Sequence, residues 1–349
     1  MRQRGSMLIF MIWILLILSV LAMSVGFRSR VNIQLSRFYD GYVKQDYLMH
    51  SAVNLASYFL SEDEDPLTDS VADPWYGEPQ RLAAFPISKQ LQVKIEDEES
   101  KLNINKAAPL LLEKFFDILK DNGVRLQTDH ADLTASIVTW RGGSSGKGGS
   151  TVGFEHKRAP FESIDELRLI QKITPQDVEM LKPYLTVYAK SGDFTLRVNI
   201  NTVHPWILKA LIETLPGGAT DKKLLYDRIE LYRQGDPNHP EEHPPLIFLA
   251  TDLTAGNFIQ KLALPSSPEM VRMVNQLIRS FTVDSQYFDV RVETKEGAAL
   301  GAKVEAVLGL RDALLVKTAR GRYTLQRRLN DVLNNYPFEI LYWSEKPVS

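Results

Sequence analysis

The sequence predicts an α+β fold with a long N-terminal helix, an antiparallel sheet, and a large all-α insertion between strands of that sheet. Three observations lead to this prediction. An uncharged run from Met7 to Gly26 is followed by an amphipathic stretch. Hydrophobic residues alternate with polar ones near residue 91 and again after residue 285, and the residues between have a helical period. A strand, a helical block and further strands are most economically read as an insertion into an α+β domain.

The composition excludes several classes of protein. The chain has 349 residues, of which 44% are hydrophobic and 24% are charged, as in ordinary folded proteins. Its net charge of −2 gives no overall positive field for nucleic acid. The absence of cysteine excludes disulfides, thiolate catalysis and cysteine metal sites. The sequence has no HExxH, Walker or G-x-S-x-G motif, so we predict no catalytic residues and no cofactor.

The run from Met7 to Gly26 is long enough to cross a bilayer. At about 1.5 Å per residue, a helix over it would span about 30 Å, which is the thickness of the hydrocarbon core. A cleaved secretory signal is one alternative, because "LAMSVGF" contains the small residues that a cleavage site needs. A buried core helix is another. Arginines lie on both sides of the run, so charge alone leaves its orientation open.

The helix is predicted to continue beyond the apolar run. Apolar residues recur there at mostly three- and four-residue spacing, at Val31, Leu35, Phe38, Tyr42, Leu48, Ala52, Leu55 and Phe59. The other side carries Arg37, Asp40, Lys44 and Gln45. We expect Gly41 to interrupt this helix and the stretch "SEDEDP" from Ser61 to Pro66 to end it.

An acidic loop comes next. Its carboxylates are Glu62, Asp63, Glu64, Asp65, Asp69 and Asp73. They could bind a cation, but such runs are more often solvated, and we predict no metal site. The segment "QLQVKIEDEE" then alternates Leu91, Val93 and Ile95 with polar residues, which is typical of a half-buried strand.

The residues from Lys101 to about Thr282 favour helices. The predicted helical segments are "APLLLEKFFDILKDNG", "DLTASIVTW", "ESIDELRLIQKI", "TPQDVEMLKPYLTVY", "HPWILKALIETL", "TDKKLLYDRIELYRQ" and "SPEMVRMVNQLIRSF". Thr174, with Pro175 and Asp177 after it, is a predicted helix start. The period then returns to two, and "QYFDVRVETK", "AKVEAVLGLR" and "FEILYWSE" are predicted strands.

The helical block contains an internal repeat, "LNINKAAPLLLEKF" at 102–115 and "VNINTVHPWILKAL" at 198–211. We predict that Asn105 and Asn201 cap the two following helices, whose first turns hold Pro109 and Pro205. The alternative is a helix-hairpin-helix DNA-binding module. Its Gly-hydrophobic-Gly hairpin is missing, because "LIQKITPQD" has no glycine and the glycines of "LPGGATDKK" are adjacent. A local basic patch of Lys222, Lys223 and Arg228 is present.

The N-terminus resembles that of type IV pilins, in which a basic leader and a glycine precede a small residue and an uncharged helix. The resemblance implies that a prepilin peptidase cuts after Gly5 and methylates the new N-terminus, Ser6. Most members of the family have glutamate at the fifth mature position, where this chain has Phe10. That departure is shared by one subclass, the K minor pseudopilin of the type II secretion system.

Further segments, in order along the chain, resemble the same subclass: "KLNINKA", "APFESIDELRLI", "LKPYLTVY", "VNINT" and "FTVDSQYF". The resemblance implies a pilin-like sheet with a helix-hairpin-helix or SAM-like insertion. It implies a single-pass protein of the bacterial inner membrane with its globular part in the periplasm. The implied role is at the pseudopilus tip, where it would act with the I and J minor pseudopilins, initiate assembly of the major pseudopilin and support export across the outer membrane. Contact with the secretin or with secreted cargo would follow from that place.

These expectations divide the chain into five parts: leader 1–5, transmembrane helix 6–26, amphipathic helix and first part of the sheet domain 27–100, insertion 101–282, and last strands 283–349. The alternative is a DNA-uptake pseudopilin of a type IV pilus. Salt-sensitive DNA binding would identify it. With the net negative charge, we expect no nucleic-acid partner.

Two loops are candidates for metal binding. Members of the family often have an acidic calcium loop after the "TW" helix, but here Gly142 to Gly153 is rich in glycine and serine and lacks acids. We therefore expect no calcium there. In "DPNHPEEHPP", His239 and His243 could pair around a metal with Glu241 or Glu242, but four prolines favour a surface loop.

Overall fold

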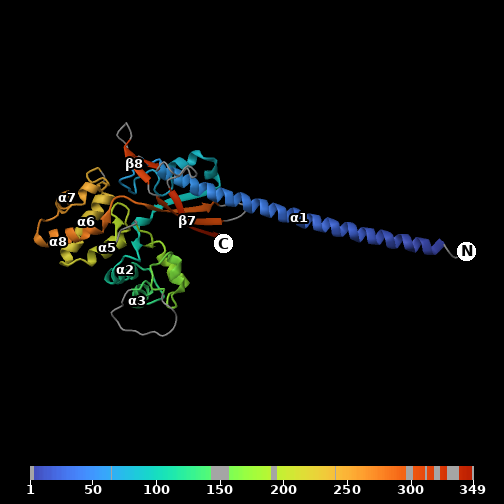
Figure 1. Cartoon of the computed structure of the whole chain (residues 1–349), viewed down its shortest axis with the longest axis horizontal. Coiled ribbons are helices and arrows are strands. Elements are labelled where there is room, and N and C mark those ends of the chain that lie inside the picture. The colour runs from blue at the N-terminus through green and yellow to red at the C-terminus, as the bar shows by residue number, and fades with distance from the viewer. Residues whose placement is uncertain are drawn as a thin grey trace.

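The computed structural model describes residues 4–63, 65–142, 157–189, 195–239, 241–295, 302–310, 313–317, 323–327 and 338–347. Its first element is one helix, α1 (Arg4–Ser61), which extends out of the globular body and carries the N-terminus at its far end (Figure 1). The predicted interruption at Gly41 is wrong, because a single glycine costs a helix only about 1 kcal/mol and α1 runs through it. The predicted end of the helix at Ser61 is confirmed.

The main sheet has four antiparallel strands in the order β1-β6-β7-β10. Their bounds are β1 (Leu91–Asp97), β6 (Tyr287–Thr294), β7 (Ala302–Leu310) and β10 (Phe338–Pro347). Val93, Val292 and Val304 are register partners across three strands, and they belong to the core that α1 covers. A separate hairpin of β8 (Ala313–Lys317) and β9 (Tyr323–Arg327) was not predicted.

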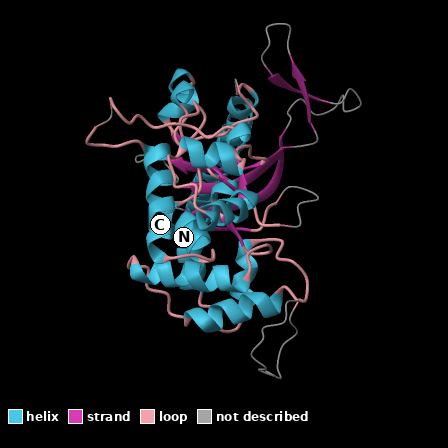
Figure 2. Ribbon diagram, turned by 90° about the vertical axis from the view of Figure 1, so that its left-hand side faces the viewer, coloured by secondary structure: helices cyan, strands magenta, loops and turns pink. Residues whose placement is uncertain are grey.

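Before β1 the chain forms two 3₁₀ turns, η1 (Gln80–Ala84) and η2 (Pro86–Lys89). Between β1 and β6 it forms the helical insertion, at the end of the molecule opposite the free end of α1 (Figure 1). Figure 2 views that end, with the helices of the insertion in front of the strands. The elements of its first half are η3 (Glu98–Ser100), β2 (Leu102–Asn103), α2 (Pro109–Asp121), α3 (His130–Trp140), η4 (Ile164–Leu169), α4 (Pro175–Leu181) and β3 (Leu185–Thr186).

The second half repeats this plan. Its elements are β4 (Val198–Asn199), α5 (Pro205–Glu213), α6 (Ala219–Gln234), η5 (Ala250–Asp252), α7 (Ala255–Lys261), α8 (Pro268–Leu277), η6 (Ile278–Ser280) and β5 (Phe281–Thr282). In each half, the short strand that ends at the first asparagine of Asn-Ile-Asn pairs in parallel with the short strand that ends the half, β2 with β3 and β4 with β5. The sequence repeat therefore marks a structural repeat, and the insertion contains these short strands as well as helices.

The described residues form two separate hydrophobic cores. One lies inside the insertion, where Phe115, Phe116, Phe248 and Phe258 are fully buried. The other lies between the sheet and the C-terminal part of α1, and Trp75 from the loop after α1 completes it. The two cores share no residue, so no common hydrophobic core joins the insertion to the sheet. The two parts are joined by contacts at their boundary instead.

Most predicted helices and strands are confirmed, but three segments of the insertion differ. Thr174 does form a capping box with Asp177 at the start of α4. The segment "ESIDELRLIQKI" forms only the 3₁₀ helix η4, because its side chains are engaged in tertiary contacts. Asp165 accepts a hydrogen bond from Tyr342 of β10, and Glu166 pairs with Lys157. The predicted helix "TPQDVEMLKPYLTVY" ends at Leu181, and Leu185 and Thr186 form β3 because they pair with β2. Helix α7 was not predicted.

Candidate functional site

The free part of α1 is the first candidate functional surface. By length and composition this helix is able to cross a membrane: from Met7 onward it contains a window of mean hydropathy 2.8 with no residue buried. Phe10 is 66% exposed. Gly5 and Ser6 lie near the beginning of the same helix. Cleavage between them and methylation of Ser6 stay predictions.

A single apolar stripe connects the free part of α1 to its buried part. Met49, Ala52, Val53, Ala56 and Leu60 are buried against the sheet. Steps of seven, four, three and four residues back from Met49 lead along the same face of the helix. These steps reach Tyr42, Phe38, Leu35 and Val31, which are 43–55% exposed. The stripe that packs on the sheet therefore continues outside the globular body, where it is open to another helix.

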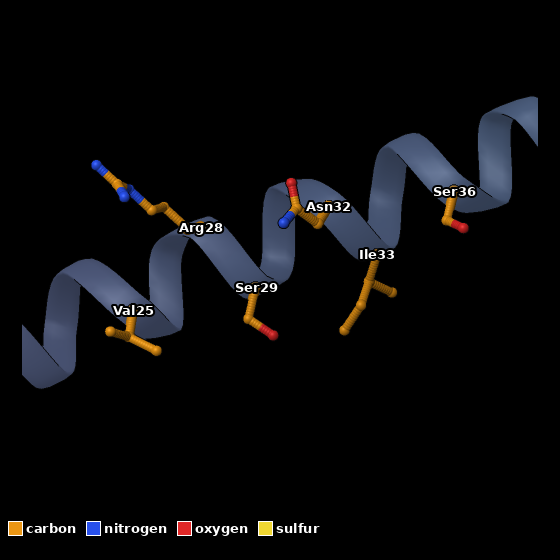
Figure 3. A pocket seen from close by; sticks show the side chains of 6 residues that line it. All are labelled: Val25, Arg28, Ser29, Asn32, Ile33 and Ser36. Carbon is orange, nitrogen blue, oxygen red and sulfur yellow. The ribbon is translucent and has the colours of Figure 1, made fainter.

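A second face of the same region of α1 carries both polar and apolar side chains. Figure 3 shows a shallow groove there, lined by Val25, Arg28, Ser29, Asn32, Ile33 and Ser36. The side chains come from successive turns of one helix and point outward into open space. No second element of the described structure faces them, so the groove is a surface feature of a lone helix and not an enclosed binding site.

Asn105 and Asn201 do not have the role predicted for them. The N-cap positions of α2 and α5 are taken by Ala108 and His204, so the capping prediction is wrong. Each asparagine instead holds a distant segment by two hydrogen bonds. Asn105 binds the backbone N–H (2.7 Å) and C=O (2.9 Å) of Phe161, and Asn201 binds those of Phe248 (2.8 and 3.0 Å).

Two arginines that sequence reasoning missed support the same repeated loop. Arg141, just after α3, donates through Nη2 to the carbonyl oxygen of Ala107 (2.7 Å). Arg233, near the end of α6, donates to the equivalent carbonyl of Val203 (2.8 Å). The sequence did contain a signal for these two arginines, because both lie near the end of the second helix of their half of the repeat.

The insertion and the sheet meet at a buried polar cluster, which we call the junction network: Asp97, Asn199, Thr202 and Ser285. Asp97 ends β1 and is fully buried. Its Oδ2 accepts hydrogen bonds from Thr202 Oγ1, Ser285 Oγ (2.7 Å) and Asn199 Nδ2 (3.0 Å), and its Oδ1 accepts one from the N–H of Glu99 (2.7 Å). Burial raises the pKa of the Asp97 carboxyl, and these donors oppose the rise.

A buried ion cluster lies beside the junction network. Lys101 is 5% exposed, and its Nζ lies 2.5 Å from Glu98 Oε1 and 3.0 Å from Asp289 Oδ2. Arg291 also donates to Asp289 Oδ2, at 2.7 Å. Burial alone would lower the pKa of the Lys101 amine, but Asp289 and Glu98 outweigh it and the pKa is raised. The cluster ties η3 of the insertion to β6 of the sheet.

The acidic loop after α1 is partly buried, and the prediction of a solvated run is wrong for Asp69, which is 3% exposed. Asp63, Asp69 and Asp73 each place one carboxylate oxygen within 4.8 Å of the others, close enough to share a cation. Burial raises the pKa of Asp73 to about 6. Their donors are Trp75 Nε1–H for Asp63, the Ser285 N–H for Asp69 and the Ser70 N–H for Asp73. Because these donors already hold the loop together, we assign the three carboxylates to its folding.

The remaining predicted sites divide into three cases. The His239 and His243 segment is an exposed loop, as predicted, and neither histidine belongs to a three-ligand group within the part of the chain that the structure describes. The glycine-rich loop lies outside the described residues after Gly142, as does Glu64 of the acidic loop. In the basic patch, Lys222 donates to the carbonyl oxygen of Glu213 (2.9 Å) at the end of α5.

Comparison with solved structures shows a similar fold in a secretion-system complex. No protein-family model and no curated protein matches the chain. A chain in the crystal structure of the GspK-GspI-GspJ complex from the type 2 secretion system of enterotoxigenic Escherichia coli matches with a TM-score of 0.55 and 17% sequence identity. The match covers 89% of this chain and 99% of that chain. The likeness extends over nearly the whole molecule, so the α+β fold with its helical insertion is that of a component of this complex.

Proposed function

We propose that this chain is a minor pseudopilin of a type II secretion system, of the K class, and that it works by assembly and not by catalysis. The observation that carries the proposal is the combination of an exposed apolar helix and a helical insertion at the opposite end of the molecule, in the fold of a chain from the GspK-GspI-GspJ complex. The first feature suits a membrane anchor that later packs among helices. The helical insertion suits a subunit at the tip of a pseudopilus, where no further subunit is stacked on it.

The proposal includes processing and partners. A prepilin peptidase would remove residues 1–5 and methylate Ser6, and α1 would then cross the inner membrane once with the body in the periplasm. The partners would be the I and J minor pseudopilins and the major pseudopilin, with contact to the secretin or secreted cargo at the tip. The apolar stripe at Val31, Leu35, Phe38 and Tyr42 is the surface on which partner helices would pack.

The test is co-purification of the full chain, in detergent, with the I and J minor pseudopilins of the same organism. We expect the wild-type chain to retain both. Phe38→Glu should reduce their recovery at least about tenfold, because a charge on the stripe must be desolvated when helices pack. Phe38 is 55% exposed, so its replacement leaves the fold of the free chain unchanged.

Ser36→Glu is the matched control. Ser36 is also on the free part of α1, in the groove of Figure 3. Two residues before Phe38, it lies about 160° around the helix from it. The same charge placed there should leave recovery of the partners unchanged. If the wild-type chain retains neither protein, the proposed function is wrong. If both variants lose the partners equally, the apolar stripe is not the packing surface.

Phe10 is expected to help restrict the chain to the tip. In pilins with glutamate at this place, a lone buried carboxylate costs several kcal/mol unless it finds a partner, which the resemblance places on the N-terminal amine of the subunit above. A subunit at the tip has no such amine to meet. Phe10→Glu should therefore let some copies enter the shaft or impair initiation, as measured by immunogold position on overproduced pseudopili and by secretion.

Phe10→Leu is the control for that experiment, since it keeps an apolar side chain in lipid and should behave like the wild type. If Phe10→Glu also stays at the tip and secretes normally, position 10 is only a lipid-facing hydrophobe. Placement at the tip would then come from the helical insertion alone.

A further inference from the structure

Glu99 is a buried carboxyl at the base of the insertion. It lies in η3, where the insertion begins, and is 9% exposed. Its Oε2 accepts the backbone N–H of Gln286 (2.9 Å), just where the insertion ends and β6 begins. The carbonyl of Gln286 in turn accepts the N–H of Leu310 in β7. This hydrogen bond therefore joins the two chain crossings between insertion and sheet.

The charged groups that face Glu99 are mainly acids. Asp97 precedes it, Asp284 faces it from the end of the insertion, and both raise the pKa of its carboxyl. From β6, Tyr287 also faces Glu99: burial, and then Glu99, raise the pKa of its phenol. Two further acids lie in this region. Asp69 lies near Asp97, and Glu339 of β10 lies near Tyr287.

The cations of the adjoining ion cluster are engaged with other acids. Lys101 binds Glu98 and Asp289, and Arg291 binds Asp289 and Glu96. His204 approaches through its backbone N–H, which donates to the carbonyl oxygen of Ser100 (3.2 Å). Among the residues that the structure describes, Glu99 therefore has a carboxylate neighbour and no ion pair with a cation.

Two neighbouring buried carboxyls cannot both be ionised cheaply in a medium of low dielectric constant. Asp97 is the better place for the negative charge, because four donors converge on it, whereas Glu99 has the Gln286 N–H and shares the Ser285 hydroxyl with Asp97. We propose that Glu99 holds a proton at neutral pH, and that its ionisation loosens the base of the insertion, so that the attachment of the helical insertion to the sheet depends on pH. This inference goes beyond the proposed function and does not rest on it.

The sign of the pH dependence follows from the direction of the shift. Burial, then Asp97, raise the pKa of Glu99 well above its ordinary value, so the folded protein binds this proton more tightly than the unfolded chain. Stability then falls as pH rises from the ordinary pKa of glutamate to the raised folded pKa, and it stays level above that point. Ordinary acid denaturation has the opposite direction.

Glu99→Gln is the test, because the amide keeps an acceptor for the Gln286 N–H and imitates the protonated acid. In the full chain in detergent, Glu99→Gln should raise Tm at about pH 8, and the gain should shrink towards about pH 5. Hydrogen exchange of residues 283–287, corrected for its intrinsic pH dependence, should accelerate at least about tenfold between about pH 6 and pH 9 in the wild type. It should stay constant in Glu99→Gln, with α2 as the internal reference.

Two controls make the outcome decisive. Glu345→Gln changes an exposed carboxyl of β10 in the same way and should leave the pH dependence unchanged. The infrared band of a protonated carboxyl at neutral pH should be present in the wild type and weaker in Glu99→Gln. If the band is the same in both proteins, or if Glu99→Gln shifts Tm equally at every pH, then Glu99 is already ionised and the proposal is wrong. A Tm that falls in Glu99→Gln and rises with calcium in the wild type would assign the cluster to a cation instead.

Discussion

Replacing Lys101 with methionine is expected to lower the free energy of unfolding by about 3–5 kcal/mol. The substitution leaves the carboxylates of Glu98 and Asp289 buried without their shared ammonium group. Asp289 is already a buried acceptor that is only partly satisfied, because its Oδ1 has no hydrogen-bond partner in the described structure. Urea unfolding of the full chain in detergent, followed by tryptophan fluorescence, measures the loss.

Lys157→Met is the matched control. Lys157 forms ion pairs with Glu162 and Glu166 on the surface, so its loss should cost much less stability than the loss of Lys101. Adding Glu98→Gln to Lys101→Met should recover part of the stability, because one of the two uncompensated charges is removed. If Lys101→Met costs no more than Lys157→Met, water reaches the cluster, and the junction is more open than the structure shows.

Asn199→Asp is expected to have the second large effect, a loss of at least about 3 kcal/mol. The fully buried Asn199 amide donates to Asp97 Oδ2, to Ser285 Oγ (2.9 Å) and to the carbonyl oxygen of Asp69 (3.0 Å). An aspartate there would place a second carboxylate against Asp97 and remove a donor from it. Thermal unfolding at about pH 7 measures the effect, and Asn199→Ala should be intermediate.

The repeat supplies the control, because Asn103 holds the equivalent place in the first half of the insertion. Its Nδ2 donates to the carbonyl oxygen of Tyr188 (2.6 Å), and it has no carboxylate partner among the described residues. Asn103→Asp should therefore cost less than Asn199→Asp. Equal losses at the two positions would mean that the asparagine loop itself matters, and that its contact with the junction network does not.

The shared asparagine motif also shows where sequence reasoning stops. Proline four residues after Asn105 and after Asn201 suggested two helix caps, and both helices do begin at those prolines. The asparagine side chains reach segments 56 and 47 residues further along the chain instead. A cap is a contact within one turn, whereas these partners come close only when each half of the insertion has folded.

The sequence by itself determined the features that depend on near neighbours: the length of α1 and its apolar stripe, the alternation of β1, the capping box at Thr174, and the repeat. Periodicity and capping act over a few residues, so they are visible in one dimension. Only the tertiary structure decided the strand order, the junction network and the burial of Lys101 and Glu99. From the sequence alone, charged residues are expected to be solvated. Which of them are buried between the two cores depends on the fold, because desolvation and ion pairing depend on partners that are distant in sequence.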